Sequence, residues 1–134
     1  MAKIKDSSCS KFQNTVENTL VRHRSILDVL TKLQEGTTRV NRAVAKSVTN
    51  CDCLKINAEK QVIPEKATLK DVSKYTSTHI SGKLCSNCKE IIETELGTTL
   101  FYLTALCVLL DLDLYEIMEK ENDRMEALGI FSLT

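Results

Sequence analysis

The hydrophobic and polar positions along the chain recur at the spacing of amphipathic helices. In the N-terminal part, Phe12, Val16 and Leu20 stand four residues apart, so they share one face of a helix. We predict a leading helix over about 9–22 on this basis, and a break in the chain near Arg24.

A longer stripe of apolar or small positions follows, with steps of three and four residues. Its members are Ile26, Leu30, Leu33, Thr37, Val40 and Val44. This stripe predicts a helix over about 26–48. Ser25 is a suitable N-cap, and Asp28 places an acidic side chain in the first turn. We expect this helix and the leading helix to lie antiparallel to each other.

The helical period returns after Cys88. One face of the expected third helix comprises Ile92, Leu96, Leu100, Leu103, Cys107 and Leu110. Phe101 and Leu109 add apolar surface on other faces, so we expect this helix to be buried on several sides. Such a helix belongs at the centre of a bundle or at a subunit interface.

A last helix is predicted after the polar break at 111–113, with Gly129 as its C-terminal stop. Its buried face is expected to comprise Leu114, Ile117, Met118, Met125 and Leu128.

The segment 49–86 has no helical period and contains the single proline. A short helix over about 69–75 is expected after Thr68, and the rest is expected to be a loop. Glycine and proline are too scarce for the turns of a many-stranded fold. The predicted fold is therefore all-α. It forms a single domain over 1–134, with four main helices and an insertion over 49–88 between the second and third of them.

Two closely spaced cysteine pairs flank this insertion. Cys51 and Cys53 form a CxC motif, and Cys85 and Cys88 form a CxxC motif. Four thiols in two pairs can surround one tetrahedral metal ion, for which a structural zinc is the default. A metal that joins both ends of a long loop would also reduce the entropic cost of ordering it.

Other interpretations of the cysteines remain open at this point. They include a redox pair or labile disulfide, an iron–sulfur centre and unconnected thiols. His79 is placed to replace one thiolate, although it also fits a solvated side chain. Cys9 stands apart near the N-terminus, and Cys107 lies in an apolar run where a thiol behaves as a small hydrophobic group.

Composition limits the classes of function. Eighteen basic and eighteen acidic side chains cancel, so the chain has no global attraction for nucleic acid. The N-terminal residues lack the apolar run of a signal peptide, and no segment approaches the ~20 apolar residues of a membrane span. We therefore expect a cytoplasmic protein without membrane or general nucleic-acid partners. The chain has no glycine-rich phosphate loop and no HExxH motif.

Three segments carry a resemblance to a known family. Residues 95–103 read ELGTTLFYL, residues 112–116 read LDLYE, and residues 120–124 read KENDR. This pattern resembles the second half of the MazG-like all-α nucleotide pyrophosphohydrolases. The resemblance covers about residues 25–48 and 88–128 and is more specific in the second block.

The resemblance implies a four-helix bundle, assembly as a homodimer or tetramer, and a phosphohydrolase site. Members of that family split a nucleoside triphosphate between its α and β phosphates. They use Mg²⁺ that is held by an EExxE motif on one helix and an ExxD motif on the next. Hard oxygen ligands suit Mg²⁺ and stabilise charge during phosphoryl or nucleotidyl transfer. Residues Lys120, Asn122 and Arg124 occupy the positions of substrate-binding side chains in the family.

This chain departs from the family pattern at the metal site. Residues 31–35 align with EExxE, but only Glu35 matches, and Lys32 occupies an acidic position. In the second motif Glu95 matches, whereas Thr98 replaces the second acid. Carboxylates remain at two of the five acidic positions, Glu35 and Glu95, as Mg²⁺ ligands. These residues fit equally well as ion pairs on a solvent-exposed helix face.

The expected function is that of a MazG-like protein with an incomplete magnesium site, which binds a nucleotide or protein partner with little or no hydrolysis. One alternative is an active pyrophosphohydrolase in which Glu90 or Asp123 supplies a missing ligand. Another is a regulatory protein that responds to zinc or to oxidation of its cysteines. Whether the chain is an enzyme is left open.

Overall fold

The computed structural model describes residues 7–129, and most of them are helical. The α-helices in this range are α1 (Ser7–Thr19), α2 (Ile26–Thr49), α3 (Val72–Tyr75), α4 (Ser86–Leu109) and α5 (Leu114–Leu128). A single 3₁₀ turn, η1 (Leu69–Asp71), and two short strands, β1 (Leu54–Ile56) and β2 (Ile80–Gly82), lie between α2 and α4. The prediction of a mainly helical chain is confirmed, whereas the strands were not expected.

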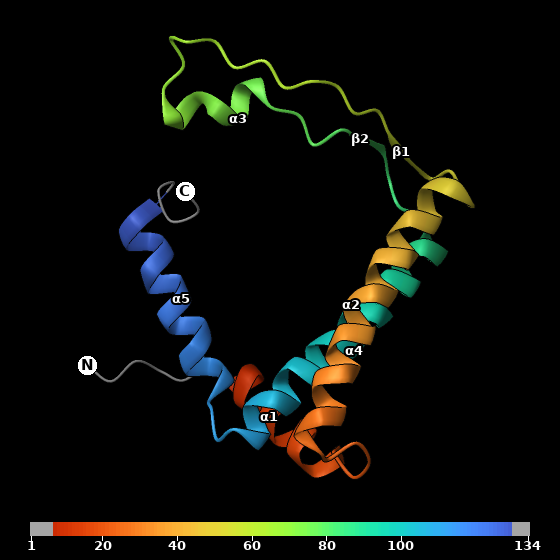
Figure 1. Ribbon diagram of the computed structural model, residues 1–134, viewed down its shortest axis with the longest axis vertical. Coiled ribbons are helices and arrows are strands. Elements are labelled where there is room, and N and C mark those ends of the chain that lie inside the picture. The colour runs from red at the N-terminus through yellow and green to blue at the C-terminus, as the bar shows by residue number, and fades with distance from the viewer. Residues whose placement is uncertain (1–6, 130–134) are drawn as a thin grey trace.

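The two longest helices, α2 and α4, lie side by side and antiparallel along their length (Figure 1). Helix α2 begins where the N-cap was expected, because the Ser25 hydroxyl accepts a hydrogen bond from the backbone N–H of Leu27 at 3.3 Å. At the other end of the pair, Cys85 is the N-cap of α4.

Small side chains form the seam between α2 and α4. On α2 the fully buried positions are Val29, Gly36 and Ser47. The large apolar residues of the expected stripe lie to one side of this line, and Ile26, Leu30 and Val44 are each more than a third exposed. The apolar stripe of α2 is therefore turned partly away from α4, with Leu33 and Val40 half-buried, because contact with α4 selects small residues that let the backbones approach.

The hairpin of α2 and α4 consequently has two different flanks, as the helical spacing of its residues shows. The apolar flank is defined by Ile26, Leu30 and Val44 of α2 and Leu96, Leu100 and Leu103 of α4. The polar flank is defined by Lys32, Glu35, Arg39, Arg42 and Lys46 of α2. All six members of the apolar flank are exposed in the chain by itself, so the expectation that α4 is buried on several sides does not hold for the isolated chain.

Helix α1 packs chiefly against α4 and α5, not along α2 as expected. Val16 and Leu20 of α1 meet Val29 and Ala105 in a small core.

Gln13 of α1 also holds the connection between α4 and α5. Its amide nitrogen donates to the backbone carbonyl of Leu112 at 2.8 Å, and its oxygen accepts from the N–H of Leu114 at 2.9 Å.

The segment between α2 and α4 is an arm that leaves the end of the hairpin far from α1 (Figure 1). Its base is an antiparallel ribbon in which Leu54 pairs with Gly82 and Ile56 pairs with Ile80. The prediction of a plain loop here is wrong for these residues. Strands of three residues leave almost no local pattern, and they pair only because both stems start at the same place.

Helix α5 diverges from the hairpin and keeps its N-terminal end against α1 (Figure 1). Asp113 caps it, and Gly129 ends it as expected, with a positive φ of 55°. Of the predicted buried face, only Leu114 is buried. The other members, Ile117, Met118, Met125 and Leu128, are each at least 43% exposed, so this prediction is wrong for the isolated chain.

One helix in the described range, α4, is long and apolar enough to cross a membrane by length and composition. This finding qualifies the expectation that no segment approaches such a length. Only 22% of its most apolar window is buried within the chain.

Candidate metal centre and interhelical pocket

The four cysteines of the CxC and CxxC motifs meet at one point. Their Sγ atoms all lie within 4.8 Å of one another, and those of Cys51 and Cys85 are 3.7 Å apart. Cys51 and Cys53 come from the turn after α2, Cys85 caps α4, and Cys88 lies in its first turn. The cluster therefore joins the end of α2, the base of the arm and the start of α4.

Local backbone structure directs these thiols inward. The N–H of Cys51 bonds to the carbonyl of Lys46 at 3.1 Å, which ends α2, and Asp52 then adopts a left-handed φ of 63°. This turn brings the Sγ of Cys53 back to 3.7 Å from the carbonyl oxygen of Ser47. At the start of α4, the N–H of Cys88 donates to the Sγ of Cys85 at 3.4 Å.

The geometry of the cluster fits a tetrahedral metal. A zinc ion with Zn–S bonds of about 2.3 Å separates its sulfur ligands by roughly 3.8 Å, close to the observed Cys51–Cys85 distance of 3.7 Å. Four sulfur donors also select soft metals over Mg²⁺ or Ca²⁺. The four thiols can therefore hold one metal ion, and the interpretation as unconnected thiols does not fit their proximity.

His79 does not join this cluster. Its Nε2 lies 3.0 Å from the side-chain nitrogen of Gln61 on the arm, and the metal-ligating group within the described residues consists of cysteines alone. Cys107 is buried, as expected for a thiol in an apolar run, and Cys9 places its Sγ 3.6 Å from the sulfur of Met118.

The clustered thiols differ in acidity. The N–H of Cys88 at the start of α4, together with the neighbouring thiols, lowers the pKa of Cys85 to about 7. Side-chain hydrogen bonding with the Cys85 thiol raises the pKa of Cys88 to about 12 and also raises the pKa of Cys51. One thiolate therefore forms readily, and its charge opposes ionisation of the others until a cation is present.

The two carboxylates that match the acidic motifs come together on the polar flank. Glu35 and Glu95 line the same interhelical pocket of about 320 Å³. Its remaining walls are Lys32, Gly36, Arg39, Thr94, Thr98 and Tyr102. Lys32 and Thr98, which replace two acids of the family pattern, thus face the same space as the two that remain.

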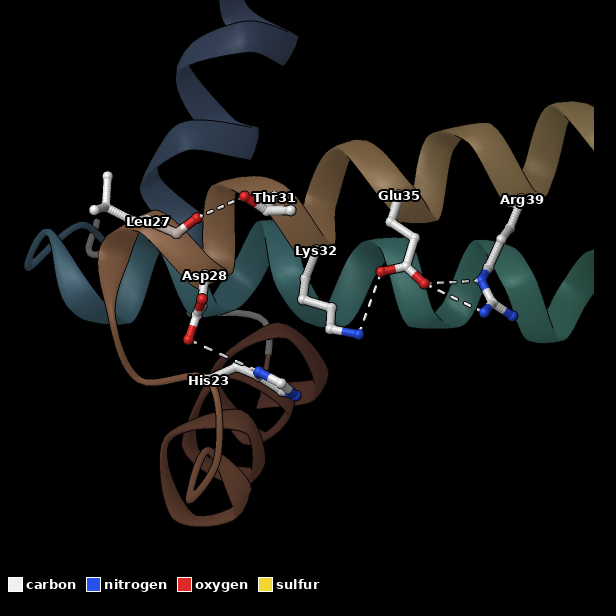
Figure 2. A network of polar contacts seen from close by, with 7 residues as sticks. All are labelled: His23, Leu27, Asp28, Thr31, Lys32, Glu35 and Arg39. Carbon is white, nitrogen blue, oxygen red and sulfur yellow. Dashed lines mark hydrogen bonds and ion pairs between the residues drawn. The ribbon is translucent and has the colours of Figure 1, made fainter.

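Glu35 is already neutralised by two cations of its own helix (Figure 2). The Lys32 ammonium lies 3.2 Å from one carboxylate oxygen, and the Arg39 guanidinium lies 3.2 Å from the other. The hydrogen bond from Lys32, aided by Arg39, holds the pKa of Glu35 below its usual range. The ion pairs anticipated on a solvent-exposed helix face are therefore present at Glu35.

The three substrate-binding candidates lie elsewhere. Lys120, Asn122 and Arg124 are exposed on α5, and none of them lines the pocket that contains Glu35 and Glu95. Asn122 donates to Glu126 at 3.1 Å, and Arg124 pairs with Glu121 within the helix. Glu90 and Asp123, the carboxylates considered as replacement Mg²⁺ ligands, do not line that pocket.

Gly36 and Tyr102 also line the pocket, and neither was predicted from the sequence to be a site residue. Gly36 is buried because it faces Thr99 of α4. A glycine inside a helical stripe was the available sign of close helix contact.

Comparison with known protein-family models, with curated proteins and with solved structures finds no match to this chain. The assignment of function therefore depends on the geometry of the cysteine cluster and of the interhelical pocket.

Proposed function

We propose that this protein is a MazG-like helical binding protein that holds a nucleotide with little or no hydrolysis. The proposal rests on one observation, that Glu35 already forms ion pairs within its own helix. This carboxylate lies in one pocket with Glu95, but Lys32 and Arg39 already occupy its oxygens. A pocket of this kind retains the shape for a ligand and lacks the free negative charge that would attract a divalent cation.

Charge is the reason to favour binding over catalysis. Mg²⁺ needs near-octahedral oxygen coordination and usually takes one or two carboxylates together with substrate phosphates. Here Glu95 is the remaining unneutralised acid in the pocket, and a lysine and a threonine stand where further acids are needed. Tyr102 lines the same pocket and is the aromatic residue on which a nucleobase would stack.

Calorimetric titration with a panel of nucleoside triphosphates, with and without Mg²⁺, tests this function together with a pyrophosphate assay. We expect binding without a requirement for Mg²⁺, and no pyrophosphate release. Turnover that needs Mg²⁺ and is abolished by Glu95→Gln would instead establish the active pyrophosphohydrolase.

The second part of the proposal concerns the cysteine cluster. We infer that it holds a structural zinc, because four thiolates at tetrahedral spacing form a closed site without an open position for chemistry. A bound metal would join the two stems of the arm to the C-terminal end of α2 and the N-terminal end of α4. A reduced thiol site of this kind belongs to a cytoplasmic protein.

The third part concerns assembly. The apolar flank and four large apolar residues of α5 (Ile117, Met118, Met125 and Leu128) are all exposed in the isolated chain, whereas a stable dimer buries about 800 Å² of each partner. We propose that a second copy of the chain covers this surface and builds a four-helix bundle from two hairpins. A bilayer is disfavoured as the cover, because α2 lies along α4 and carries charged residues over most of its length.

A further inference from the structure

A second pocket, of about 440 Å³, opens on the polar flank of the hairpin and continues from the first one. The two pockets share Arg39 and Glu95. The walls of the second pocket are completed by Arg42, Ala43, Lys46 and Ile91. It lies nearer to the cysteine end of the hairpin, as the numbering of its residues along α2 and α4 shows.

Positive charge dominates this pocket. Arg39, Arg42 and Lys46 follow one another at intervals of three and four residues, so they form one row along α2 that spans about 10 Å. Glu95 is the single carboxylate among the lining residues. Arg42 and Lys46 have no ion-pair partner within the described part of the chain, although the protein as a whole has no net charge.

Glu35 holds Arg39 in place but contacts only one edge of its guanidinium group. Glu35 binds its Nε and one terminal nitrogen, each at 3.2 Å (Figure 2). The other terminal nitrogen keeps its N–H donors, and the side chain is 60% exposed. A guanidinium fixed on one edge in this way is preorganised to bind an anion with its free edge.

We propose that this row of cations binds the phosphate chain of the ligand directly, so that Arg39, Arg42 and Lys46 perform the neutralising role that a divalent cation has in a phosphohydrolase. The proposal rests on the proposed function for the identity of the ligand as a nucleoside polyphosphate. The length of the row suits a chain of two or three phosphates. With a nucleobase at Tyr102 in the first pocket, the phosphate chain would extend along this row into the second pocket.

The position of the pocket agrees with the proposed assembly. The pocket-lining residues of α4 and the leucines of the apolar flank lie on different sides of the seam at Thr99. The lining residues are Ile91, Thr94, Glu95, Thr98 and Tyr102, and the leucines are Leu96, Leu100 and Leu103. A second copy on the apolar flank therefore leaves the row of cations open to ligand.

Calorimetric titration of the full chain in Mg²⁺-free buffer, with tripolyphosphate and with nucleoside triphosphates as separate probes, tests the proposal. We expect both probes to bind, and Arg42→Gln/Lys46→Gln to weaken both by at least about tenfold. The matched control is Arg22→Gln/Lys70→Gln, which removes the same two charges outside the pocket. We expect this control to bind like the unmodified chain.

The outcomes separate this proposal from the proposed function. Nucleotide binding that is equal in the pocket variant and the control, or that requires Mg²⁺, overturns the row of cations as the phosphate site and leaves nucleotide binding standing. Binding of tripolyphosphate alone, lost in the pocket variant, supports the row and removes the nucleotide. Absence of binding by both probes overturns the proposal, as does tighter binding of a single-stranded oligonucleotide than of either probe.

Discussion

Gly36 of α2 faces Thr99 of α4 so closely that a β-carbon on the glycine would stand 2.8 Å from the Thr99 hydroxyl oxygen. That hydroxyl is not free to move away, because it donates to the carbonyl of Glu95 at 2.9 Å. The contact sets how near the two long helices approach at the interhelical pocket.

Gly36→Ala should therefore destabilise the protein by about 1–3 kcal/mol, since the added methyl group forces the helices apart. Gly97→Ala is the matched control, because a β-carbon at Gly97 meets nothing within 4 Å. The control should gain about 0.5–1 kcal/mol from the higher helix propensity of alanine. Chemical denaturation measures both changes. Equal stability of the two variants would show that the seam is not tightly packed at Gly36.

Removing the metal should loosen the arm and leave the helical core folded. The ribbon of β1 and β2 pairs only three residues of each strand, so the proposed metal at its base would supply much of its order. We expect hydrogen exchange over residues 54–56 and 80–82 to accelerate after chelation, with little change around Val16 and Ala105. Unchanged protection of the ribbon would mean that the strands hold without the metal.

The metal-free cluster should show one thiol of unusual reactivity. Alkylating reagents attack thiolates, and the thiolate fraction of Cys85 rises as pH increases through about 7. Below that pH the alkylation rate should fall about tenfold per unit. Mass spectrometry after brief treatment of the reduced, metal-free protein should find Cys85 modified first and Cys88, with its pKa of about 12, modified last. The reverse order would contradict the arrangement of Cys85 at the helix N-terminus.

Charges placed on the apolar flank should separate the copies of the chain. Leu100→Glu/Leu103→Glu puts two carboxylates into the surface that we propose to be shared, and light scattering should then report a monomer. Glu90→Lys on the same helix is the control and should leave the dimer intact. An unmodified chain that is monomeric at micromolar concentration would contradict the assembly.

The sequence predicts the long helices closely because their ends depend on neighbouring residues. Ser25 begins α2 and Gly129 ends α5 through local hydrogen bonds and local backbone conformation. The ribbon could not be predicted in this way, because the pairing of Leu54 with Gly82 depends on two stems that meet only in the folded chain.

Burial was harder to predict than helix position. Leu100 and Thr104 stand one turn apart on the same side of α4, yet only the threonine is buried, with its hydroxyl donating to the carbonyl of Leu100. Hydrophobicity alone assigns the leucine to the interior. Burial along α4 depends on which elements lie beside each turn, and Leu100 is exposed in the isolated chain.

The two candidate sites also differ in how much of each can be predicted from the sequence. The cysteine spacing was sufficient to predict that four thiols meet, because each pair is local and a single metal explains both. The pairing of Glu35 with Lys32 and Arg39 was visible as helical spacing, but its position in a pocket with Glu95 required the contact between α2 and α4.

Metal analysis of the purified protein tests the central claim most directly. Native mass spectrometry combined with elemental analysis should find one zinc ion per chain, and Cys85→Ser/Cys88→Ser should lose it while Cys9→Ser/Cys107→Ser retains it. A chain that carries no metal when purified under reducing conditions, or that keeps its metal in the Cys85→Ser/Cys88→Ser variant, would contradict the proposed zinc site. Iron with inorganic sulfide in place of zinc would replace it with an iron–sulfur centre.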